Sequence, residues 1–366
     1  MLKRAAKNML HTMLRAYRDW KLNRRIFRRS NALLKSHPQW IGLTPQEKAQ
    51  IRDKDYGQYA AYKNVYGKFE EGFVSDSLYL RILRILNSAN YTSAGSDILA
   101  HNLFGNKNYF ALLLKYLTLP KTVIMSINGE LFSQDYQLIT EESALDIMNA
   151  HSQLVFKPAA GTGHGTHVSL VDRKDFSAAM SQYVKYTEGG GDFIVQEVLR
   201  QHESFSRFNK SSVNVIRITT LFWKSELYIL GAILRAGVPG EFCDHTTSQN
   251  NNHPRIIALD NEGRLTGKFI DPDLADVYGD CYGVPPEGVI PKFREMKELC
   301  LKEHMRFPHH RIIGWDITLD ENENITCIEY NPGWPGIIQS QYVLGPVFMQ
   351  KSSRGVPLLY EILDGK

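Results

Sequence analysis

Apolar and polar residues follow two different periods along this chain. Residues 1–30 predict an amphipathic helix, because apolar side chains recur every three or four positions at Leu2, Ala6, Met9, Met13, Tyr17 and Trp20. Residues 31–118 also predict mainly helices, most clearly at 75–90, where Leu78, Ile82, Ile85 and Leu86 share one face. From Pro120 onward, short runs rich in β-branched residues indicate strands separated by further helices. This mixture, without a strict strand–helix–strand repeat, predicts an α+β fold.

The strand-like runs lie at 121–129, 153–158, 167–173, 193–199, 213–223, 227–237, 311–320 and 324–332. Helical patterns occupy 104–120, 142–152, 175–189 and 291–305. The polar tetrapeptide 321–324 separates the last two strands, which predicts a β-hairpin.

Charge is distributed unevenly along the 366 residues, which have a formal net charge of +4. Residues 1–30 hold ten Lys or Arg and one acidic residue, so the rest of the chain is mildly acidic. The basic arm suits three interpretations: a helix docked on the body, a helix on the surface of an anionic membrane, or a nucleic-acid contact. The acidic body does not suggest nucleic-acid binding.

Membrane and redox signals are weak in this sequence. No run of about 18 uncharged apolar residues occurs, so no membrane-spanning segment is expected. The four cysteines (Cys243, Cys281, Cys300 and Cys327) form no CxxC pair, which fits buried thiols in a reducing compartment. We therefore expect a cytoplasmic protein, with peripheral contact to the inner face of the membrane through residues 1–30 as an alternative.

Three polar side chains mark the predicted hairpin. Asp316 lies in its first strand, and Glu329 and Asn331 lie in its second, on one face because strand side chains alternate. Two carboxylates and an amide oxygen that converge there would suit Mg²⁺, which prefers oxygen ligands and substrate phosphates. The alternative is a solvated polar sheet face with no ligand.

Two further motifs precede this hairpin. In the first, a strand ends at Lys157 and is followed by Gly161, Gly163 and Gly165, whose backbone N–H groups could approach phosphate oxygens. In the second, a strand ends at Gln196 and Glu197. Such a strand end can present backbone groups to an adenine edge, and a carboxylate beyond it can bind ribose. A simple glycine turn and a strand followed by a charged loop are the alternatives.

The ordered set of motifs resembles the ATP-grasp superfamily of carboxylate–amine ligases. The segments GNKNYF, PKTVIMSINGELF, LVFKPAAGTGHG, FIVQEVL, SVNVIRITT, AILRAG, FPHHRIIGWDIT and CIEYNPGWPG are similar to the sugar-transfer-associated ATP-grasp family, over roughly residues 90–340. The resemblance implies two α+β subdomains that clamp ATP, preceded by a mainly helical N-terminal region. The expected divisions are 1–30, 31–118, 119–203 and 204–366: the arm, the helical region, a first subdomain with the glycine loop and adenine hinge, and a second subdomain with the metal and acceptor sites.

The resemblance also implies roles for individual residues. The ATP-binding residues would be Lys107, Lys157, Gly161, Gly163, Gly165, Gln196, Glu197, Leu199 and Glu203. The catalytic residues would be Arg217, Arg235 and Lys157, and the Mg²⁺ ligands would be Asp316, Glu329 and Asn331. Two departures are notable: Asn106 stands where the family commonly has Asp, and Asp244-His245 follows AILRAG without the family's paired glycines.

The implied activity is ATP-dependent joining of a carboxylate to an amine through an acyl phosphate, with release of ADP. The family context suggests an amino acid and a sugar or sugar precursor as partners, in bacterial capsule or exopolysaccharide biosynthesis. An amino-acid or peptide ligase without a sugar substrate is one alternative. A non-catalytic ATP-binding scaffold is another, although three intact metal-ligand positions disfavour it.

Overall fold

The computed structural model describes residues 28, 32–86, 105–160, 167–188, 191–242, 253–273, 275–332 and 335–365. The chain forms two compact units. The first contains Met1–Ile85, Leu274–Asp276 and Gly345–Lys366, and the second contains Leu86–Asp273 and Val277–Leu344. The four-part division expected from the sequence remains a prediction.

The described part of the first unit is helical, as the sequence pattern predicts. Its elements are α2 (Pro45–Gln50), α3 (Tyr56–Tyr66), α4 (Asp76–Leu86), the 3-10 turn η4 (Val347–Met349) and α12 (Leu358–Asp364). Helix α2 begins with a capping box, in which Thr44 and Glu47 each bond the other's backbone N–H. Aromatic side chains fill the interior, where the rings of Tyr62 and Phe73 stack with their centroids 4.4 Å apart.

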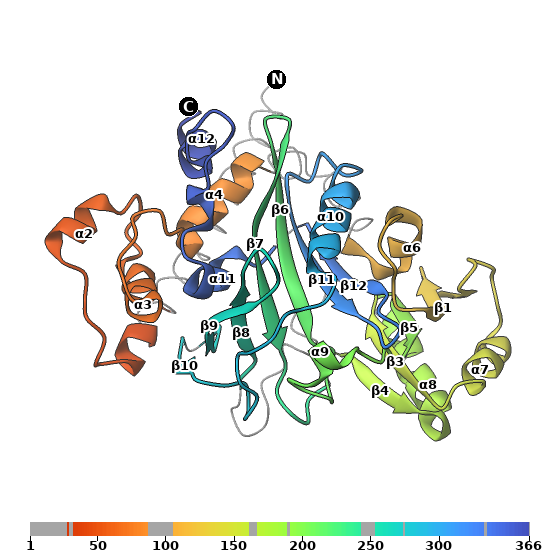
Figure 1. The fold of residues 1–366 in the computed structure, drawn as a ribbon. Coiled ribbons are helices and arrows are strands. Elements are labelled where there is room, and N and C mark those ends of the chain that lie inside the picture. Colours follow the sequence, from red (N-terminus) through yellow and green to blue (C-terminus); the bar gives the residue numbers. More distant parts are fainter. Residues whose placement is uncertain are drawn as a thin grey trace, which may run out of the picture. The chain divides into compact units, whose positions relative to one another are not determined.

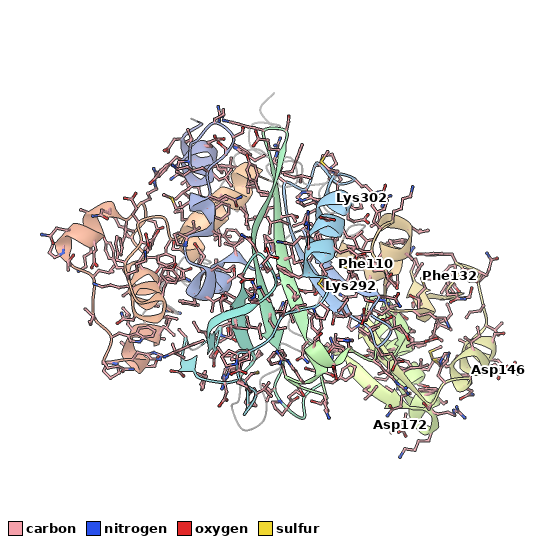
Figure 2. The ribbon with its side chains drawn as sticks, viewed as in Figure 1. Phe110, Phe132, Asp146, Asp172, Lys292 and Lys302 are labelled. Carbon is pink, nitrogen blue, oxygen red and sulfur yellow. The ribbon has the colours of Figure 1, made fainter. Side chains whose placement is uncertain are left out.

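A five-stranded antiparallel sheet forms one part of the second unit, in the order β2-β1-β5-β3-β4. Its strands are β1 (Thr122–Ile127), β2 (Glu130–Ser133), β3 (Gln153–Pro158), β4 (Ser169–Asp172) and β5 (Phe193–Glu197). Helices α7 (Glu141–Asn149) and α8 (Phe176–Glu188) supply the apolar side chains that close its core, with the 3-10 turn η3 (Arg173–Asp175) before α8. Asp146 on α7 and Asp172 at the end of β4 mark this region in Figure 2.

A seven-stranded antiparallel sheet forms the rest of the second unit, in the order β10-β9-β8-β7-β6-β11-β12 (Figure 1). Its strands are β6 (Val215–Trp223), β7 (Glu226–Ala236), β8 (Arg255–Leu259), β9 (Leu265–Ile270), β10 (Val277–Tyr278), β11 (Ile312–Leu319) and β12 (Ile325–Asn331). Helix α10 (Phe293–His304) packs on β6, β7 and β11, and α11 (Ile337–Leu344) packs on β7, β8 and β9. The short helix α9 (Glu203–Ser206) precedes β6.

The two faces of this sheet differ in chemistry because strand side chains alternate. Ile216, Ile218, Leu234 and Trp315 point into a core that α10 covers. Side chains one position away point to the opposite face, which is where Arg217 of β6, Arg235 of β7 and Asp316 of β11 lie. This alternation puts charged side chains on one face, while apolar side chains on the other face stabilise the unit.

The helix predicted over 104–120 is shorter in the structure. Only the 3-10 turn η2 (Lys107–Tyr109) and α6 (Phe110–Leu113) form there. The buried carboxylate of Glu303, on α10, accepts hydrogen bonds from the backbone N–H groups of Lys115 and Tyr116, at 3.0 and 2.6 Å. Because these N–H groups bond to Glu303 and not to carbonyls within a helix, α6 does not continue past Leu113. Strands β8, β9 and β10 were not predicted from the pattern.

The α+β fold class is confirmed by the two sheets and their covering helices. In the described part of the chain, no helix combines the length and apolarity needed to span a membrane. Cys281, Cys300 and Cys327 are buried free thiols, and burial raises the pKa of Cys281 to about 12. Cys243 and the predicted arm at 1–30, apart from Arg28, lie outside the described residues.

Candidate nucleotide and metal site

A β-bulge positions the three predicted metal ligands. Asp316 pairs in register with Glu329, and Gly314 pairs with Asn331, but Ile317 pairs with Cys327. Ile328 is therefore an extra residue in β12, so that Cys327 stays in the core while Glu329 turns to the face of Asp316. The Asn331 amide donates a hydrogen bond to Asp316 Oδ2 at 3.3 Å. The three side chains predicted to converge thus lie together.

Asp316 is held by two buried arginines. Arg217, its register partner on β6, donates from Nε to Oδ1 at 2.5 Å and from Nη2 to Oδ2 at 2.8 Å, a bidentate pair. Arg235 Nη1 lies 3.5 Å from the same Oδ1. Arg217 Nη1 also donates to the Pro335 carbonyl at 3.0 Å, which ties the strand to the segment after β12.

Glu329 forms a separate ion pair with Lys107. Lys107 Nζ, on η2, lies 2.9 Å from Glu329 Oε1. Burial disfavours ionisation of Glu329, but the Lys107 ammonium outweighs it. With Arg217 and Lys157 contributing further, the pKa of Glu329 falls to about 2. Glu329 is therefore a permanent anion at any physiological pH.

A pocket of about 310 Å³ opens beside this pair. Its wall contains three residues assigned to ATP from the sequence, Lys107, Lys157 and Gln196. Gln196 on β5 is fixed by a hydrogen bond from its Nε2 to the Pro120 carbonyl at 3.1 Å. The lining also contains apolar side chains, among them Leu119, Met125 and Ile328, and polar ones, among them Asp135. The combination of apolar side chains and a cationic end suits a base attached to a polyphosphate.

The other predicted nucleotide-binding residues lie differently. Glu197 forms an ion pair with Lys121, with Oε1 and Nζ 2.7 Å apart, and its backbone N–H donates a hydrogen bond to the Lys121 carbonyl. Leu199 is half-buried, and Glu203 is exposed at the start of α9. None of these three lines the 310 Å³ pocket. Gly161, Gly163 and Gly165 lie outside the described residues.

Several pocket residues carried no individual assignment from the sequence. Phe110 on α6, labelled in Figure 2, lines the pocket and packs edge-to-face on Tyr330 with ring centroids 6.1 Å apart. Asn108 donates to the Ser126 carbonyl at 2.6 Å and so fixes η2 against β1. Both lie in GNKNYF, beside Lys107, so the motif contained the signal but not the side-chain roles.

The charges around the trio favour a metal-bound polyanion. Lys107, Lys157, Arg217 and Arg235 bring four positive charges to two carboxylates, Asp316 and Glu329. An excess of cations in a partly enclosed site attracts phosphate groups. The donor set of two carboxylates and one amide oxygen fits Mg²⁺, which takes few protein ligands and completes its shell with phosphate and water.

The fold and the cation-rich pocket are features of a nucleotide-binding protein. The family model for sugar-transfer associated ATP-grasp proteins matches residues 86–354, and the chain belongs to this family. This confirms the resemblance and the ATP-grasp fold, and supports ATP binding and ligase chemistry as the class of activity. No curated protein matches the chain.

Solved structures of similar fold are distant in sequence. The ATP-grasp ligase PsnB, complexed with its minimal precursor, is 14% identical and has a TM-score of 0.42 over 79% of this chain and 68% of its own. D-alanyl-alanine synthetase A from Vibrio cholerae is 15% identical, with a TM-score of 0.43 over 74% and 66%. An L-amino acid ligase from Bacillus licheniformis is 14% identical, with a TM-score of 0.38 over 72% and 48%.

Proposed function

We propose that this protein is an ATP-dependent carboxylate–amine ligase that works through an acyl phosphate and releases ADP. The observation that supports the proposal most directly is the convergence of Asp316, Glu329 and Asn331 with Lys107 and Arg217 beside the pocket. Metal ligands, phosphate-binding cations and an apolar slot are the parts that phosphoryl transfer from ATP requires.

ATP would lie with its base against the apolar lining near Gln196 and its phosphates toward Lys107 and Lys157. Gln196 and the end of β5 would present hydrogen-bonding groups to the adenine edge, with Glu197, Leu199 and Glu203 farther along the same segment. Gly161, Gly163 and Gly165, from the predicted glycine loop, would cover the phosphates. Each of these roles is a proposal from the family motif.

Asp316, Glu329 and Asn331 would hold Mg²⁺. When bound, the ion would neutralise charge on the phosphate oxygens and orient them. The low pKa of Glu329 keeps one of these carboxylates ionised, and the two bonds from Arg217 orient the carboxylate of Asp316.

In the reaction, a carboxylate oxygen of the first substrate would attack the γ-phosphorus, and the bond to ADP would break. The amine of the second substrate would then attack the acyl carbon, lose a proton and expel phosphate, leaving an amide. Arg217 and Arg235 would bind the first substrate's carboxylate and the transferring oxygens. No side-chain nucleophile is needed, because positioning and charge stabilisation provide most of the acceleration.

We propose an amino acid and a sugar or sugar precursor as the substrates, in capsule or exopolysaccharide biosynthesis, because the matching family is the sugar-transfer associated one. A cytoplasmic location, with peripheral membrane contact through residues 1–30, is part of the same proposal. Liposome flotation of the full chain and of a chain without residues 1–30 tests the membrane contact: equal recovery on anionic lipid would refute it.

Hydroxylamine trapping tests the chemistry without knowledge of the amine. The protein is incubated with ATP, Mg²⁺, hydroxylamine and pools of uronic acids or of amino acids. We expect ADP and a hydroxamate that depend on one pool, and loss of both in Glu329→Gln and Asp316→Asn. AMP with pyrophosphate would refute phosphoryl transfer. Nucleotide binding without turnover on any pool would favour the scaffold. In a second incubation amino acids replace hydroxylamine, and amide formation between two amino acids would favour a peptide ligase.

A further inference from the structure

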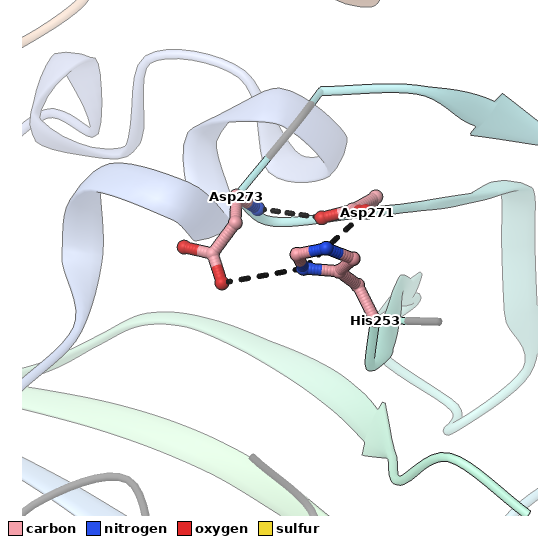
Figure 3. A group of neighbouring side chains, drawn as sticks. All are labelled: His253, Asp271 and Asp273. Atoms are coloured by element: carbon pink, nitrogen blue, oxygen red, sulfur yellow. Dashed lines mark hydrogen bonds and ion pairs between the residues drawn. The ribbon is translucent and has the colours of Figure 1, made fainter. Parts of the chain in front are cut away.

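A second polar cluster lies at the far end of the seven-stranded sheet from β12. His253 lies two residues before β8, and Asp271 and Asp273 lie one and three residues after β9. These two strands are antiparallel neighbours, with Ile256 paired to Ile270, so the start of one lies beside the end of the other. The topology therefore brings three side chains with metal-binding chemistry together, as Figure 3 shows.

The potential ligand atoms converge on one point. His253 Nδ1 lies 3.8 Å from Asp271 Oδ2 and 3.9 Å from Asp273 Oδ2, and all three atoms lie within 4.8 Å of one another. These separations are too long for hydrogen bonds. They are close to those that a shared ion imposes on its ligands.

Both carboxylates are oriented by a bond to their other oxygen. The Asp273 backbone N–H donates to Asp271 Oδ1 at 2.7 Å, and Gln339 Nε2, from α11, donates to Asp273 Oδ1 at 3.2 Å (Figure 3 shows the first). Each Oδ2 is thereby turned toward the imidazole. Outer hydrogen bonds of this kind fix metal ligands in position.

His253 Nδ1 is the third potential ligand atom of the cluster. His253 Nδ1 is a buried atom that makes no hydrogen bond within the described residues. The His253 side chain is 17% exposed and that of Asp271 is 1% exposed, while Asp273 is 33% exposed and leaves a route from solvent. A buried imidazole nitrogen that faces two carboxylate oxygens suits a cation.

Arg255 partly neutralises the negative charge of the cluster but does not occupy the space between the three ligand atoms. Its Nη1 lies 4.0 Å from Asp271 Oδ2 and donates to the His253 carbonyl at 3.2 Å. Its guanidinium also stacks on the Tyr278 ring, at 3.3 Å from the centroid. With a neutral imidazole, the cluster therefore keeps a net charge of −1, which still favours a divalent cation.

We propose that His253 Nδ1, Asp271 Oδ2 and Asp273 Oδ2 bind a first-row divalent metal ion such as Zn²⁺. Bonds of about 2.0–2.2 Å in a tetrahedral site separate ligand atoms by about 3.4 Å. The two distances from His253 therefore need to shorten by about 0.4–0.5 Å, and the distance between the two carboxylates, which is within 4.8 Å, by at most about 1.4 Å. An imidazole nitrogen in the set favours Zn²⁺ over Mg²⁺, which distinguishes this site from the all-oxygen set at Asp316. The ion would clip the start of β8 to the end of β9.

Zinc titration of the full-length, chelator-stripped protein by calorimetry tests the proposal. We expect one site in the wild type that is weakened at least ~100-fold in His253→Gln and Asp271→Asn. Removal of the outer hydrogen bond in Gln339→Leu should weaken it by ~10-fold. Exposed His309 provides the matched control, since His309→Gln should leave the site intact.

Two further measurements separate this site from other possibilities. Glu329→Gln should retain the zinc site, because it alters only the proposed magnesium site; the outcome therefore does not depend on the proposed ligase activity. Zn²⁺ should raise the Tm of the wild type but not that of His253→Gln. This comparison tests the site even if the Asp271→Asn variant does not fold. Absence of stoichiometric uptake, or uptake that His253→Gln leaves unchanged, would overturn the proposal.

Discussion

The Arg217–Asp316 pair provides the strongest test of how the candidate site is built. Its side chains are only 9% and 6% exposed, and two short bonds join them. Removing one partner of a buried ion pair typically costs ~3–5 kcal/mol, because the other charge remains without compensation. Arg235 stays 3.5 Å from Asp316 in the Arg217→Met variant, so we expect the low end, about 3 kcal/mol.

The double-mutant cycle isolates the contribution of the pair. Asp316→Asn alone should cost about 3 kcal/mol as well, since two buried arginines then face a neutral amide. The double variant should be much less unstable than the sum of the two, with a coupling energy of at least ~1.5 kcal/mol. Urea unfolding followed by tryptophan fluorescence, to which the fully buried Trp315 beside Asp316 in β11 contributes, measures the free energy of unfolding.

An exposed pair on α10 supplies the matched control. The side chains of Arg294 and Glu298 are 89% and 63% exposed, and Arg294 Nε lies 3.1 Å from Glu298 Oε1. Arg294→Met and Glu298→Gln should each cost less than ~1 kcal/mol, with a coupling near ~0.4 kcal/mol. The reasoning would be refuted if Arg217→Met cost no more than Arg294→Met, or if the cycle at Arg217 and Asp316 were additive.

Three further predictions follow from neighbouring contacts. Lys107→Met should weaken Mg²⁺–ADP binding by ~10–100-fold in calorimetry, since one charged contact contributes ~1.5–3 kcal/mol; unchanged affinity would exclude Lys107 from the phosphate site. The pKa of Glu329, lowered from 4.5 to about 2, stabilises the fold above pH 4.5, and this contribution is lost as the pH falls toward 2. Urea midpoints at pH 6 and pH 3 should therefore differ less in Lys107→Met than in the wild type. Gly314→Ala should destabilise the protein and impair turnover, because its Cβ would lie 2.7 Å from the Pro335 carbonyl oxygen, whereas Gly279→Ala meets nothing within 4 Å and should be neutral.

The convergence of Asp316, Glu329 and Asn331 could be anticipated because it needs only strand alternation and a hairpin. The way in which it is achieved could not be read from the pattern. Plain alternation would put Cys327 and Glu329 on one face, and only the extra residue Ile328 separates them. A bulge depends on the register of the neighbouring strand, which has no local signature in the sequence.

Tertiary competition explains most of the remaining differences. Residues 104–120 have a helical pattern, yet Glu303 from α10 captures the backbone donors that would have continued α6. The partners of Lys107 and Arg217 were likewise hidden, because Glu329 and Asp316 lie far along the chain. Sequence motifs identified which residue types gather at the site, but not which of them pair.

These pairings carry a mechanistic consequence. Two of the four cations proposed for phosphate or carboxylate binding form ion pairs with carboxylates proposed for Mg²⁺: Lys107 with Glu329, and Arg217 with Asp316. A nucleotide that bound alone would have to draw Lys107 away from Glu329, which would leave the Glu329 carboxylate without a cation. A metal ion that bound alone would have to draw Glu329 away from Lys107, which would leave the ammonium without an anion. If both bound as proposed, each ion pair would be exchanged for two new contacts, one to phosphate and one to the metal, without an uncompensated charge. The proposed function therefore implies a preference for the metal–nucleotide complex over either component, with charged groups already held in place and little reorganisation needed when the phosphoryl group is transferred.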